Sequence, residues 1–469
     1  MRKLLPLLFI FFITACSQSL ENEGVDSPPE NLINLTQEEY LSIVYENPSE
    51  LDTIEVKNLV SDFLNSINEK EKSINISTRS ISSDFSLNVN SKSYYKEKSS
   101  SQTRAIYGDK LELPVYEVNV TSSKGTGVVY VSADERNAEV ITYIPQVAKD
   151  EELFIKSGAA FLVKWAKESS YERLIETEKI RKELHNATVA KISKQLRIDE
   201  SQVTVDNILN RISVGGTRAT PVNRPSTSVV AMVAPIVKTE WSQNSPYNLS
   251  LAKPNAPSTQ AHVYTGCAVT AACQLMTAIK PNLTLNGTVI DWEYLTEDPT
   301  IYSNAPQRKL DMLGKLHSWV FKQLDAVAQY DIYGYHNGTG VSASSQIWFY
   351  GNYFNHSENY SEYDPDALLR SFNAGRPSLI RGQGHAWIVD GYIIANKAVA
   401  SSAKSTRAVI IQYYDMFWHA NLGWGGSANG YYKLKPDAHV VFEASGHKFT
   451  TEGLSIYPGL YKKDISYKF

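Results

Sequence analysis

The spacing of hydrophobic and polar residues changes along the chain, and its first part mixes two periods. Apolar residues at helical spacing predict short helices within residues 32–75 and a longer, strongly charged helix over 152–196. The alternation that is typical of strands recurs in three segments, 113–119, 127–132 and 140–144. Between these elements, the Ser- and Lys-rich stretch 80–110 predicts a loop. This part of the chain is therefore expected to be a mixed α+β unit.

A second pattern begins at residue 229, where the chain becomes rich in tryptophan, tyrosine and glycine. A helix of small residues is expected to start at Cys267, and another helix is expected over residues 310–329. Short apolar strands follow, over 378–381, 386–392, 408–414, 418–422 and 430–434. Because these strands lack a βαβ rhythm, their spacing predicts antiparallel pairing and an α+β fold class.

Residues 212–228 separate the two patterns. They are rich in Gly, Pro, Ser and Thr, contain Arg218 and Arg224, and show no apolar period. Exposed segments of this kind are preferred sites of proteolytic cleavage, so the two arginines are candidate processing sites. The boundaries that follow are a first domain, a linker and a second domain, over 32–215, 216–228 and 229–469. A plain surface loop between two halves of one domain is the alternative.

Composition sets the protein class. A chain of 469 residues is too long for one ordinary domain, and its 42% hydrophobic content is sufficient for a sizeable core. The formal net charge of −4 and the isoelectric point near 6.2 argue against a general nucleic-acid binder, which usually presents a basic face. We therefore expect a globular protein of two or three domains.

The N-terminus has the pattern of a targeting segment. Two basic residues precede the apolar segment 4–13, which is too short to span a bilayer. Residues 13–16, Ile-Thr-Ala-Cys, resemble a bacterial lipobox, in which Cys16 becomes the lipidated first residue of the mature protein. We expect 1–15 to be a signal peptide and 16–31 a tether. An ordinary signal peptide is the alternative. The expected location is the bacterial cell envelope, at the outer membrane or cell surface.

The sequence Gly266-Cys267 places a thiol where the small-residue helix begins. The partial positive charge and free N–H groups of a helix N-terminus stabilise a thiolate, so Cys267 is a candidate nucleophile with a lowered pKa. A buried structural cysteine is the alternative. Cys273 lies on another side of the same helix, too far along it for a disulfide. No companion ligands at metal spacing accompany the two cysteines, and no metal site is expected.

A thiol nucleophile needs a base that can return the proton to the leaving group, and histidine suits this task. His385 follows two glycines at the start of an apolar strand, where a substrate can approach closely. His419 lies in the later strand 418–422 and is a competing base. A histidine at a strand end with its nitrogens satisfied by backbone groups is the structural alternative.

Three further residues extend this candidate site. The Asn421 side-chain oxygen can orient a histidine base by accepting from its second nitrogen, and Trp424 can shield that bond from water. His419 and Asn421 alternate onto the same strand face, so this spacing does not decide between the two histidines. Upstream, the Gln243 amide is a candidate donor to an oxyanion, together with the Cys267 backbone N–H.

The four segments together resemble the streptopain-like cysteine proteases, a papain-like family of secreted bacterial endopeptidases. The resemblance covers residues 236–434 and rests on three runs and their order. The runs are Gly-Cys-Ala-Val-Thr-Ala-x-x-Gln-Leu-Met, Gly-His-Ala-Trp-Ile-Val-Asp-Gly and His-x-Asn-x-Gly-Trp-Gly-Gly. More loosely, the strands over 113–144 are similar to the family's propeptide.

This resemblance implies a fold and a chemistry. The fold is α+β, with a helical part and an antiparallel sheet, preceded by an α+β pro-domain that inhibits the enzyme. The implied activity is hydrolysis of peptide bonds in protein or peptide substrates, without a cofactor. The implied roles are Cys267 as nucleophile, His385 as general acid and base, Asn421 as the residue that orients His385, and Gln243 as oxyanion donor. His419 then has a structural place.

Further positions follow from the same resemblance. The Gly- and Ser-rich segment 338–345 lies where the family has a substrate-lining loop, which makes Ser342 and Ser344 candidates for backbone contacts. The family usually has tryptophan directly after the asparagine, whereas this chain has Leu422. A catalytically inactive surface-binding lipoprotein of the same fold is therefore the alternative function, and transamidation at the same site is another.

Overall fold

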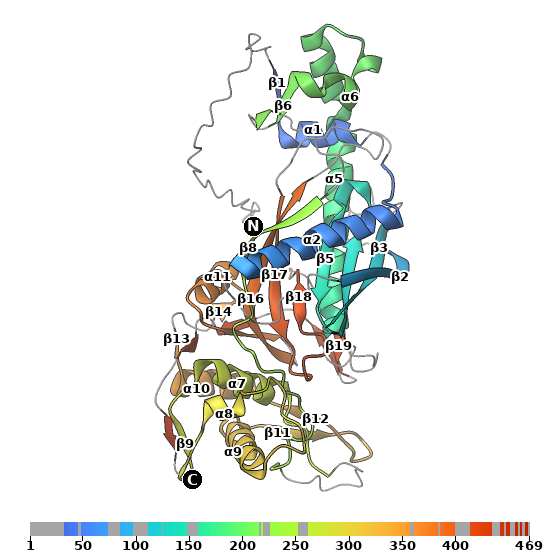
Figure 1. Cartoon of the computed structure of the whole chain (residues 1–469). Helices are drawn as coiled ribbons and strands as arrows, with labels where there is room; N and C mark the ends of the chain where they lie inside the picture. The colour runs from blue at the N-terminus through green and yellow to red at the C-terminus, as the bar shows by residue number, and fades with distance from the viewer. Residues whose placement is uncertain are drawn as a thin grey trace, which may run out of the picture.

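The structure is a computed structural model. It describes residues 32–45, 48–73, 85–96, 111–123, 125–147, 158–214, 217–218, 226–251, 261–356, 361–382, 385–398 and 413–433, and five short strands beyond residue 440. The molecule is elongated, with a small module at one end, a large sheet in the middle and a helical unit at the other end (Figure 1). Over these residues, no helix is both long and apolar enough to cross a membrane.

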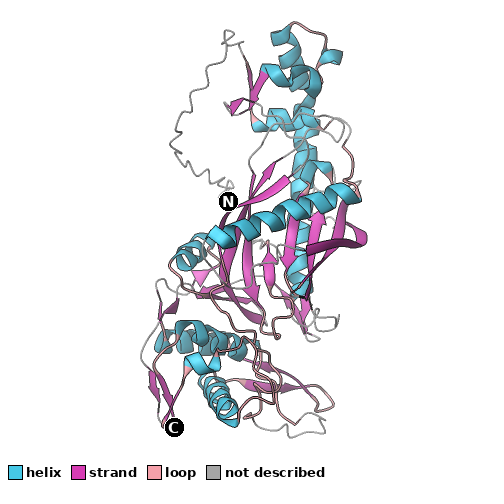
Figure 2. Cartoon of the chain, in the orientation of Figure 1, coloured by secondary structure: helices cyan, strands magenta, loops and turns pink. Residues whose placement is uncertain are grey.

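One antiparallel sheet forms the middle of the molecule (Figure 2). Its strands are β2 (Phe85–Tyr95), β3 (Leu113–Ser122), β4 (Gly125–Ser132), β5 (Glu139–Ile144), β8 (Ser226–Val233), β14 (Ser361–Glu362), β15 (Ser378–Gly382), β16 (His385–Ala398), β17 (Tyr413–Asn421), β18 (Gly430–Tyr432) and β21 (Ser455–Tyr457). They lie in the order β14-β21-β15-β16-β17-β18-β5-β4-β3-β2, and β8 pairs with the later part of β16. The predicted α+β class with antiparallel strands is confirmed.

The sheet contains strands from both sides of the predicted linker. Strand β5 pairs with β18, which places Tyr143 opposite Tyr431 and Thr142 opposite Tyr432. The rings of Tyr143 and Tyr431 stack with their planes 5° apart. The predicted pro-domain and the predicted protease domain therefore share one hydrogen-bonded ladder.

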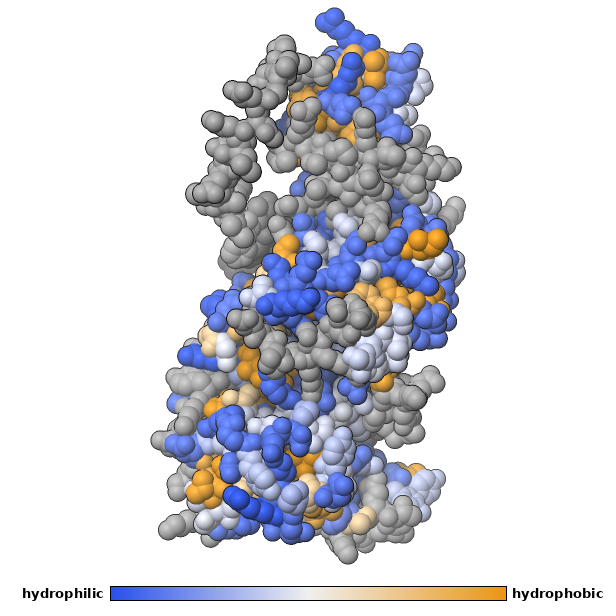
Figure 3. All heavy atoms as spheres, viewed as in Figure 1, coloured by the Kyte–Doolittle hydropathy of each residue, from blue (hydrophilic) through white to orange (hydrophobic). Residues whose placement is uncertain are grey.

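Two helices of the predicted pro-domain cover opposite faces of this sheet. Helix α2 (Thr53–Ser73) has an apolar stripe on one face, and its Phe63 packs against Tyr143 and Phe417. Its outer side is mostly hydrophilic, apart from the exposed Ile54 at its start (Figure 3). Helix α5 (Ala159–Leu196) covers the other face, where Trp165 joins the cluster that contains Trp418. Burying both faces against helices gives the sheet a core on each side.

Buried charges lie at the same junction. Glu139 of β5 is within 3.1 Å of Lys433 and 2.9 Å of Arg173, and Lys397 of β16 lies 3.7 Å from it. Asp415 of β17 contacts Lys433 at 3.0 Å and Arg173 at 2.6 Å. These cations hold the pKa of the Glu139 carboxyl well below its usual range despite its burial, and burial lowers the pKa of Lys397 to about 8. The cluster joins the two halves of the chain electrostatically.

The helical unit forms a second core. It contains α7 (Cys267–Ile279), α8 (Trp292–Leu295), α9 (Gln307–Gln323) and α10 (Ala343–Tyr353), with the short strands β9 (Leu283–Leu285), β10 (Thr288–Val289), β11 (Val327–Tyr330) and β12 (His336–Gly340). The buried stripes of α7 and α9 meet here, and Ile388 of β16 reaches the same cluster. Helix α7 is therefore packed directly against the strand that carries His385.

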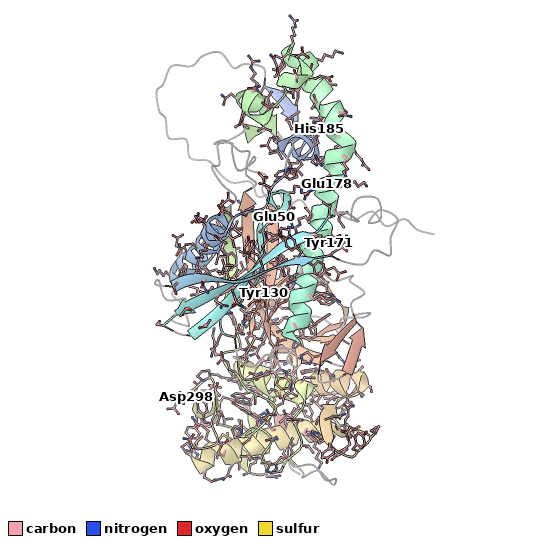
Figure 4. All side chains as sticks on the ribbon, turned by 90° about the vertical axis from the view of Figure 1, so that its right-hand side faces the viewer. Glu50, Tyr130, Tyr171, Glu178, His185 and Asp298 are labelled. Carbon is pink, nitrogen blue, oxygen red and sulfur yellow. The ribbon has the colours of Figure 1, made fainter. Side chains whose placement is uncertain are left out.

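The module at the far end is built around the second half of α5. It contains β1 (Ile33–Leu35), α1 (Gln37–Val44), α6 (Val205–Ile208), β6 (Ile212–Val214) and β7 (Thr217–Arg218). Its small core includes Tyr40 and Ile192. His185, Glu178 and Tyr171 mark the course of α5 from this module down to the sheet (Figure 4). His185 Nδ1 lies 2.9 Å from the backbone oxygen of Ser42, so α1 is fastened to α5.

The remaining elements are short or lie at the edges. Helix α11 (Pro365–Asn373) packs against β15 and β16, and its first turn is capped by the Asp364 side chain. The other elements are three single 3₁₀ turns, over 135–137, 200–202 and 209–211, and the strands β13 (Asn355–His356), β19 (Val441–Ala444), β20 (His447–Thr450), β22 (Leu460–Tyr461) and β23 (Ile465–Tyr467).

The prediction of a loop over 80–110 was wrong for part of that stretch. Residues 85–95 form β2, which lies at the end of the sheet and pairs with β3. Phe85, Leu87 and Val89 alternate toward the α2 core, whereas the second half of the strand is largely exposed. Ser and Lys suit an edge strand because its outer side faces water and charges discourage further pairing.

Other boundaries also differ from the sequence prediction. Residues 413–414 and 418–421, predicted in two separate strands over 408–414 and 418–422, belong to the single strand β17. Within the predicted linker 216–228, residues 217–218 form β7 and residues 226–228 already belong to β8. The helix predicted over 310–329 spans 307–323, and its last residues instead form β11. The apolar spacing continues beyond residue 323 and predicts further helix, but Asp325, with φ +48°, ends the turn.

Candidate active site

Cys267 is the first residue of α7, as the sequence predicts. Gly266 precedes it with φ +85°, a conformation that favours glycine. A Cβ atom at this position would lie only 2.8 Å from the backbone oxygen of Thr339, so β12 approaches the helix start closely. Thr339 also donates its hydroxyl to the Tyr264 oxygen at 2.6 Å. The backbone around the thiol is thus fixed from both sides.

The thiol of Cys267 is half-buried beside β16. Burial raises the pKa of this thiol, whereas hydrogen bonds from the backbone N–H groups of Ala386, Ala268 and Cys267 itself, and the charge of Arg381, act in the opposite direction. The balance differs from the lowered pKa predicted from the helix N-terminus. Desolvation outweighs the helix end in this state of the protein.

His385 is the first residue of β16 and is buried. Its ring stacks on Trp387, with centroids 5.6 Å apart and planes at 20°. Gly158, the N-cap of α5, lies near the Cδ2–Nε2 edge of the ring: an added Cβ atom there would be 3.7 Å from His385 Cδ2 and 3.8 Å from Nε2. Nε2 has no hydrogen-bond partner in the described part of the chain. Burial lowers the pKa of His385 to about 4, which favours the neutral imidazole.

The thiol and the imidazole occupy different sides of β16. Trp387 and Val389, which alternate with His385, join the cluster beneath α5, whereas Ile388 joins the cluster of α7. The Ala386 N–H, next to His385 in the chain, acts on the Cys267 thiol and lowers its pKa against the effect of burial. The structure brings the two residues to the neighbouring elements α7 and β16, without a hydrogen bond between their side chains among the described residues.

Asn421 ends β17 and lies opposite Ile388 of β16. Its Oδ1 accepts from Gln274 Nε2 at 3.1 Å and from the Gly423 N–H at 3.2 Å, and its Nδ2 donates to the Thr239 oxygen at 2.9 Å. No hydrogen bond from Asn421 to His385 is present among the described residues. The predicted strand pairing is therefore observed, and the orienting contact stays a prediction.

Gln243 is buried close to the thiol. Its backbone oxygen accepts from the Thr265 N–H at 3.1 Å, two residues before Cys267. The preceding Trp241 is held by the Gly425 N–H, which donates to its oxygen at 3.1 Å. The segment that carries the candidate oxyanion donor is thus tied to the start of α7 and to the glycine turn after β17.

The competing base, His419, has a different partner. Its Nδ1 lies 2.6 Å from Asp390 Oδ1, and both side chains are buried. The second oxygen of Asp390 accepts from the Val237 N–H at 2.7 Å. His419 therefore belongs to a contact that fastens β17 to β16 and to the segment leading to Gln243.

The residues predicted to line or shield the site lie in two separate places, at the start of α10 and in the turn after β17. Ser342 caps α10 by accepting from the Ser345 N–H at 3.0 Å, and its hydroxyl lies 2.9 Å from that of Ser344. The segment 338–345 was predicted as a loop, but it is the end of β12 and the start of α10. Trp424 is partly buried and packs, with Leu422, in the cluster beneath α5.

Other predicted positions fall outside this geometry. Cys273 is fully buried in the core of the helical unit, as expected of a packing residue. Arg218 lies in β7, where its backbone pairs with Ser213. Cys16 and Arg224 lie outside the described residues. Among the residues that the structure covers, no cluster of three or more His, Cys, Asp or Glu is arranged to hold a metal ion.

Two residues of the site were missed by the sequence argument. Gly158 contacts His385 from 227 positions upstream, and nothing in the local pattern signals this contact. Gln274 lies inside the Gly-Cys-Ala-Val-Thr-Ala-x-x-Gln-Leu-Met run, but no role was assigned to it. The available signal was its long polar side chain among the mostly small and apolar residues of this helix.

Comparison with known proteins adds an independent result. The family model of the Peptidase C10 family matches residues 241–432. Among solved structures, a mutant fragment of prointerpain A from Prevotella intermedia is 15% identical, with a TM-score of 0.42, over 80% of this chain and 100% of that chain. No curated protein gives a match. Residues 241–432 are thus a match to the Peptidase C10 family, and the resemblance to streptopain-like cysteine proteases is confirmed.

Proposed function

We propose that this protein is the zymogen of a cysteine endopeptidase that hydrolyses peptide bonds through Cys267, His385, Asn421 and Gln243. The observation that carries the proposal is the position of Cys267 at the N-terminus of α7, beside the strand that begins with His385, inside the region that matches the Peptidase C10 family. A thiol at a helix N-terminus next to a histidine is the arrangement that acyl transfer by cysteine requires.

The proposed mechanism divides the chemistry among these residues. The Cys267 thiolate attacks the carbonyl carbon of the scissile peptide, and the oxyanion receives hydrogen bonds from the Gln243 amide and the Cys267 N–H. His385 takes the thiol proton and gives it to the leaving amine, after which water hydrolyses the thioester and restores the thiol. Asn421 orients the imidazole once the pro-domain has left it.

The proposed latency rests on the contact between α5 and His385. Gly158 lies against the imidazole, on the side of β16 that faces away from α7. The buried, neutral ring is held by Trp387 and the start of α5, so the base is unavailable to the thiol. Activation in this proposal requires that the start of α5 leaves His385.

Export and processing form the remaining part of the proposal. We propose that Cys16 carries a lipid that anchors the protein at the bacterial cell envelope, at the outer membrane or cell surface, and that cleavage after Arg218 or Arg224 separates the pro-domain from the protease. Because Cys16 precedes the pro-domain, such a cut leaves the anchor on the pro-domain side. The proposed partners are protein or peptide substrates and the pro-domain itself. No nucleic acid is among them.

A digestion assay with a matched pair of cysteine variants tests the proposed activity. After proteolytic activation, the wild type is expected to digest casein and to be labelled by a vinyl-sulfone thiol probe, and Cys267→Ala is expected to do neither. Cys273→Ala removes the other described thiol, which is buried in the helix core, and should retain both activities. Equal and poor labelling of the wild type and Cys267→Ala would instead support an inactive binding protein.

A further inference from the structure

Gln274 occupies a buried position between the elements of the candidate site. It lies seven residues after Cys267 on α7, about two helical turns, and its side chain is fully buried. A buried amide without hydrogen-bond partners destabilises the fold, so buried amides are almost always bonded. The partners of the Gln274 amide therefore show which segments it positions. Both ends of the Gln274 amide are used.

The oxygen end of Gln274 holds the segment of the candidate oxyanion donor. Oε1 accepts from the backbone N–H of Trp241 at 2.8 Å, two residues before Gln243. Since this N–H belongs to no strand or helix, the side chain supplies the bond that regular structure would otherwise provide. The segment is therefore positioned by α7 itself.

The nitrogen end of Gln274 holds the asparagine. Nε2 donates to Asn421 Oδ1 at 3.1 Å, and Asn421 Nδ2 lies 3.3 Å from Gln274 Oε1. Asn421 in turn donates to the Thr239 oxygen at 2.9 Å, which returns to the Trp241 segment. The three partners form a closed ring of hydrogen bonds behind the nucleophile. A closed, buried ring of this kind has one geometry in which every polar atom is satisfied.

We propose that Gln274 is a positioning residue that sets Gln243 and Asn421 relative to Cys267. This inference rests on the proposed peptidase function, and it assigns Gln274 no contact with substrate. An oxyanion donor acts only when it lies within hydrogen-bond distance of the developing charge, and a displacement of about 1 Å can lower the rate about 100-fold. Through the hydrogen bonds of Gln274, helix α7 sets the positions of the Gln243 and Asn421 side chains.

The first test removes the ring without creating a cavity. Gln274→Met keeps the length of the side chain and loses all three of its hydrogen bonds, to the Trp241 N–H and to both ends of the Asn421 amide. In the full chain after proteolytic activation, kcat for a fluorogenic peptide is expected to fall about 10- to 100-fold. The rate at which iodoacetamide alkylates Cys267 is expected to change less than about twofold, because the substitution leaves the thiol and the start of α7 untouched. The proposal is overturned if kcat is unchanged, or if kcat falls only by the same factor as the alkylation rate.

A matched control is available on α10. Gln346 is also a buried glutamine of the helical unit, and its Oε1 has no hydrogen-bond partner within the described residues. Gln346→Met makes the same chemical change at similar burial. The proposal expects near wild-type kcat for this variant, and an equal loss in both variants overturns it.

The second test uses pH as a rescue. Gln274→Glu has the shape of glutamine, but an ionised carboxylate repels Asn421 Oδ1, whereas a protonated one donates to it as the amide does. Burial raises the pKa of such a carboxyl. The ratio of Gln274→Glu to wild-type kcat is therefore expected to rise as pH falls, and the Gln274→Met ratio to stay flat. A flat ratio for Gln274→Glu contradicts the proposed donor.

A third measurement separates this inference from the peptidase proposal. If the wild type retains a reactive Cys267 but hydrolyses no peptide, the peptidase proposal fails. Hydrogen exchange of the uncleaved protein then tests the ring directly. The Trp241 amide is expected to exchange at least about tenfold faster in Gln274→Met than in the wild type or Gln346→Met. Equal exchange in all three proteins overturns the role of Gln274.

Discussion

Gly158 of the predicted pro-domain lies against the imidazole of His385, with an added Cβ atom 3.7 Å from the ring. This contact joins the first residue before α5 to the first residue of β16. The start of α5 therefore lies beside the ring, and Nε2 has no hydrogen-bond partner among the described residues. In the proposed zymogen, this contact links the position of α5 to the availability of His385 as the base.

We expect Gly158→Ala to weaken latency. Gly158 has φ +82°, which costs an L-residue roughly 1–2 kcal/mol, so the start of α5 should leave His385 several times more often. Hydrolysis of a fluorogenic peptide by the uncleaved protein should rise accordingly. Gly375→Ala provides the control, because Gly375 has φ +67° and nothing within 4 Å of an added Cβ. Equal activity of the two variants would refute the latch.

Acid should loosen the same contact. With α5 docked, burial lowers the pKa of His385 to about 4 from its usual 6.5. Above pH 6.5 the imidazole is neutral in both states and docking is at full strength. As pH falls from 6.5 to 4, only the undocked imidazole gains a proton, and docking loses up to about 3 kcal/mol.

Hydrogen exchange at the first turn of α5 measures this effect. Exchange should accelerate between pH 7.5 and 5 after correction for intrinsic rates, and His385→Gln should remove the dependence. His317, whose pKa burial also lowers to about 4, lies in the core of the helical unit and is unchanged in both proteins. A dependence that persists in His385→Gln would assign it to another group.

Removing a single charge from the buried ion cluster at the sheet junction should lower the free energy of unfolding. Glu139→Gln leaves Lys397 and Lys433 buried with one carboxylate fewer, which is expected to cost about 3–5 kcal/mol. The midpoint of urea unfolding should fall, and fragments cut in the linker should separate at lower urea. Glu178→Gln is the control, because the cationic partners of Glu178 all belong to the pro-domain. It should leave fragment separation nearly unchanged.

Introducing the family's usual tryptophan at Leu422 should destabilise this chain. Leu422 is buried in the cluster that contains Trp387 and Trp165, and a larger side chain there is expected to cost about 1–3 kcal/mol. Thermal unfolding of Leu422→Trp should begin several degrees lower. A raised melting temperature would mean that the cluster has unfilled space.

The pattern of apolar and polar residues predicted the elements that depend mainly on residues close in the sequence. The small residues after Cys267, the alternating strands from 113 and the antiparallel order of the later strands all follow from side-chain periodicity, and the structure confirms them. Strand β2 was missed because an edge strand carries polar residues that resemble a loop.

The contacts between side chains of different elements could not be predicted from the sequence. The helix-end argument for Cys267 predicts a lowered pKa, but burial by distant segments reverses the sign. Asn421 was assigned to His385 from motif order, yet Gln274, Thr239 and Gly423 use its hydrogen-bonding groups in this state. Such outcomes depend on which side chains meet after folding, and a single sequence does not specify this.

The pairing of β5 with β18 changes what activation means for this molecule. A cut between β7 and β8 breaks one peptide bond, but the two fragments remain associated through the sheet that they share. Dissociation would strip α2 and α5 from the sheet and leave β18 as an open edge with unpaired backbone groups. In the proposed maturation, the protease must therefore cover again the sheet surfaces that α2 and α5 bury in the precursor.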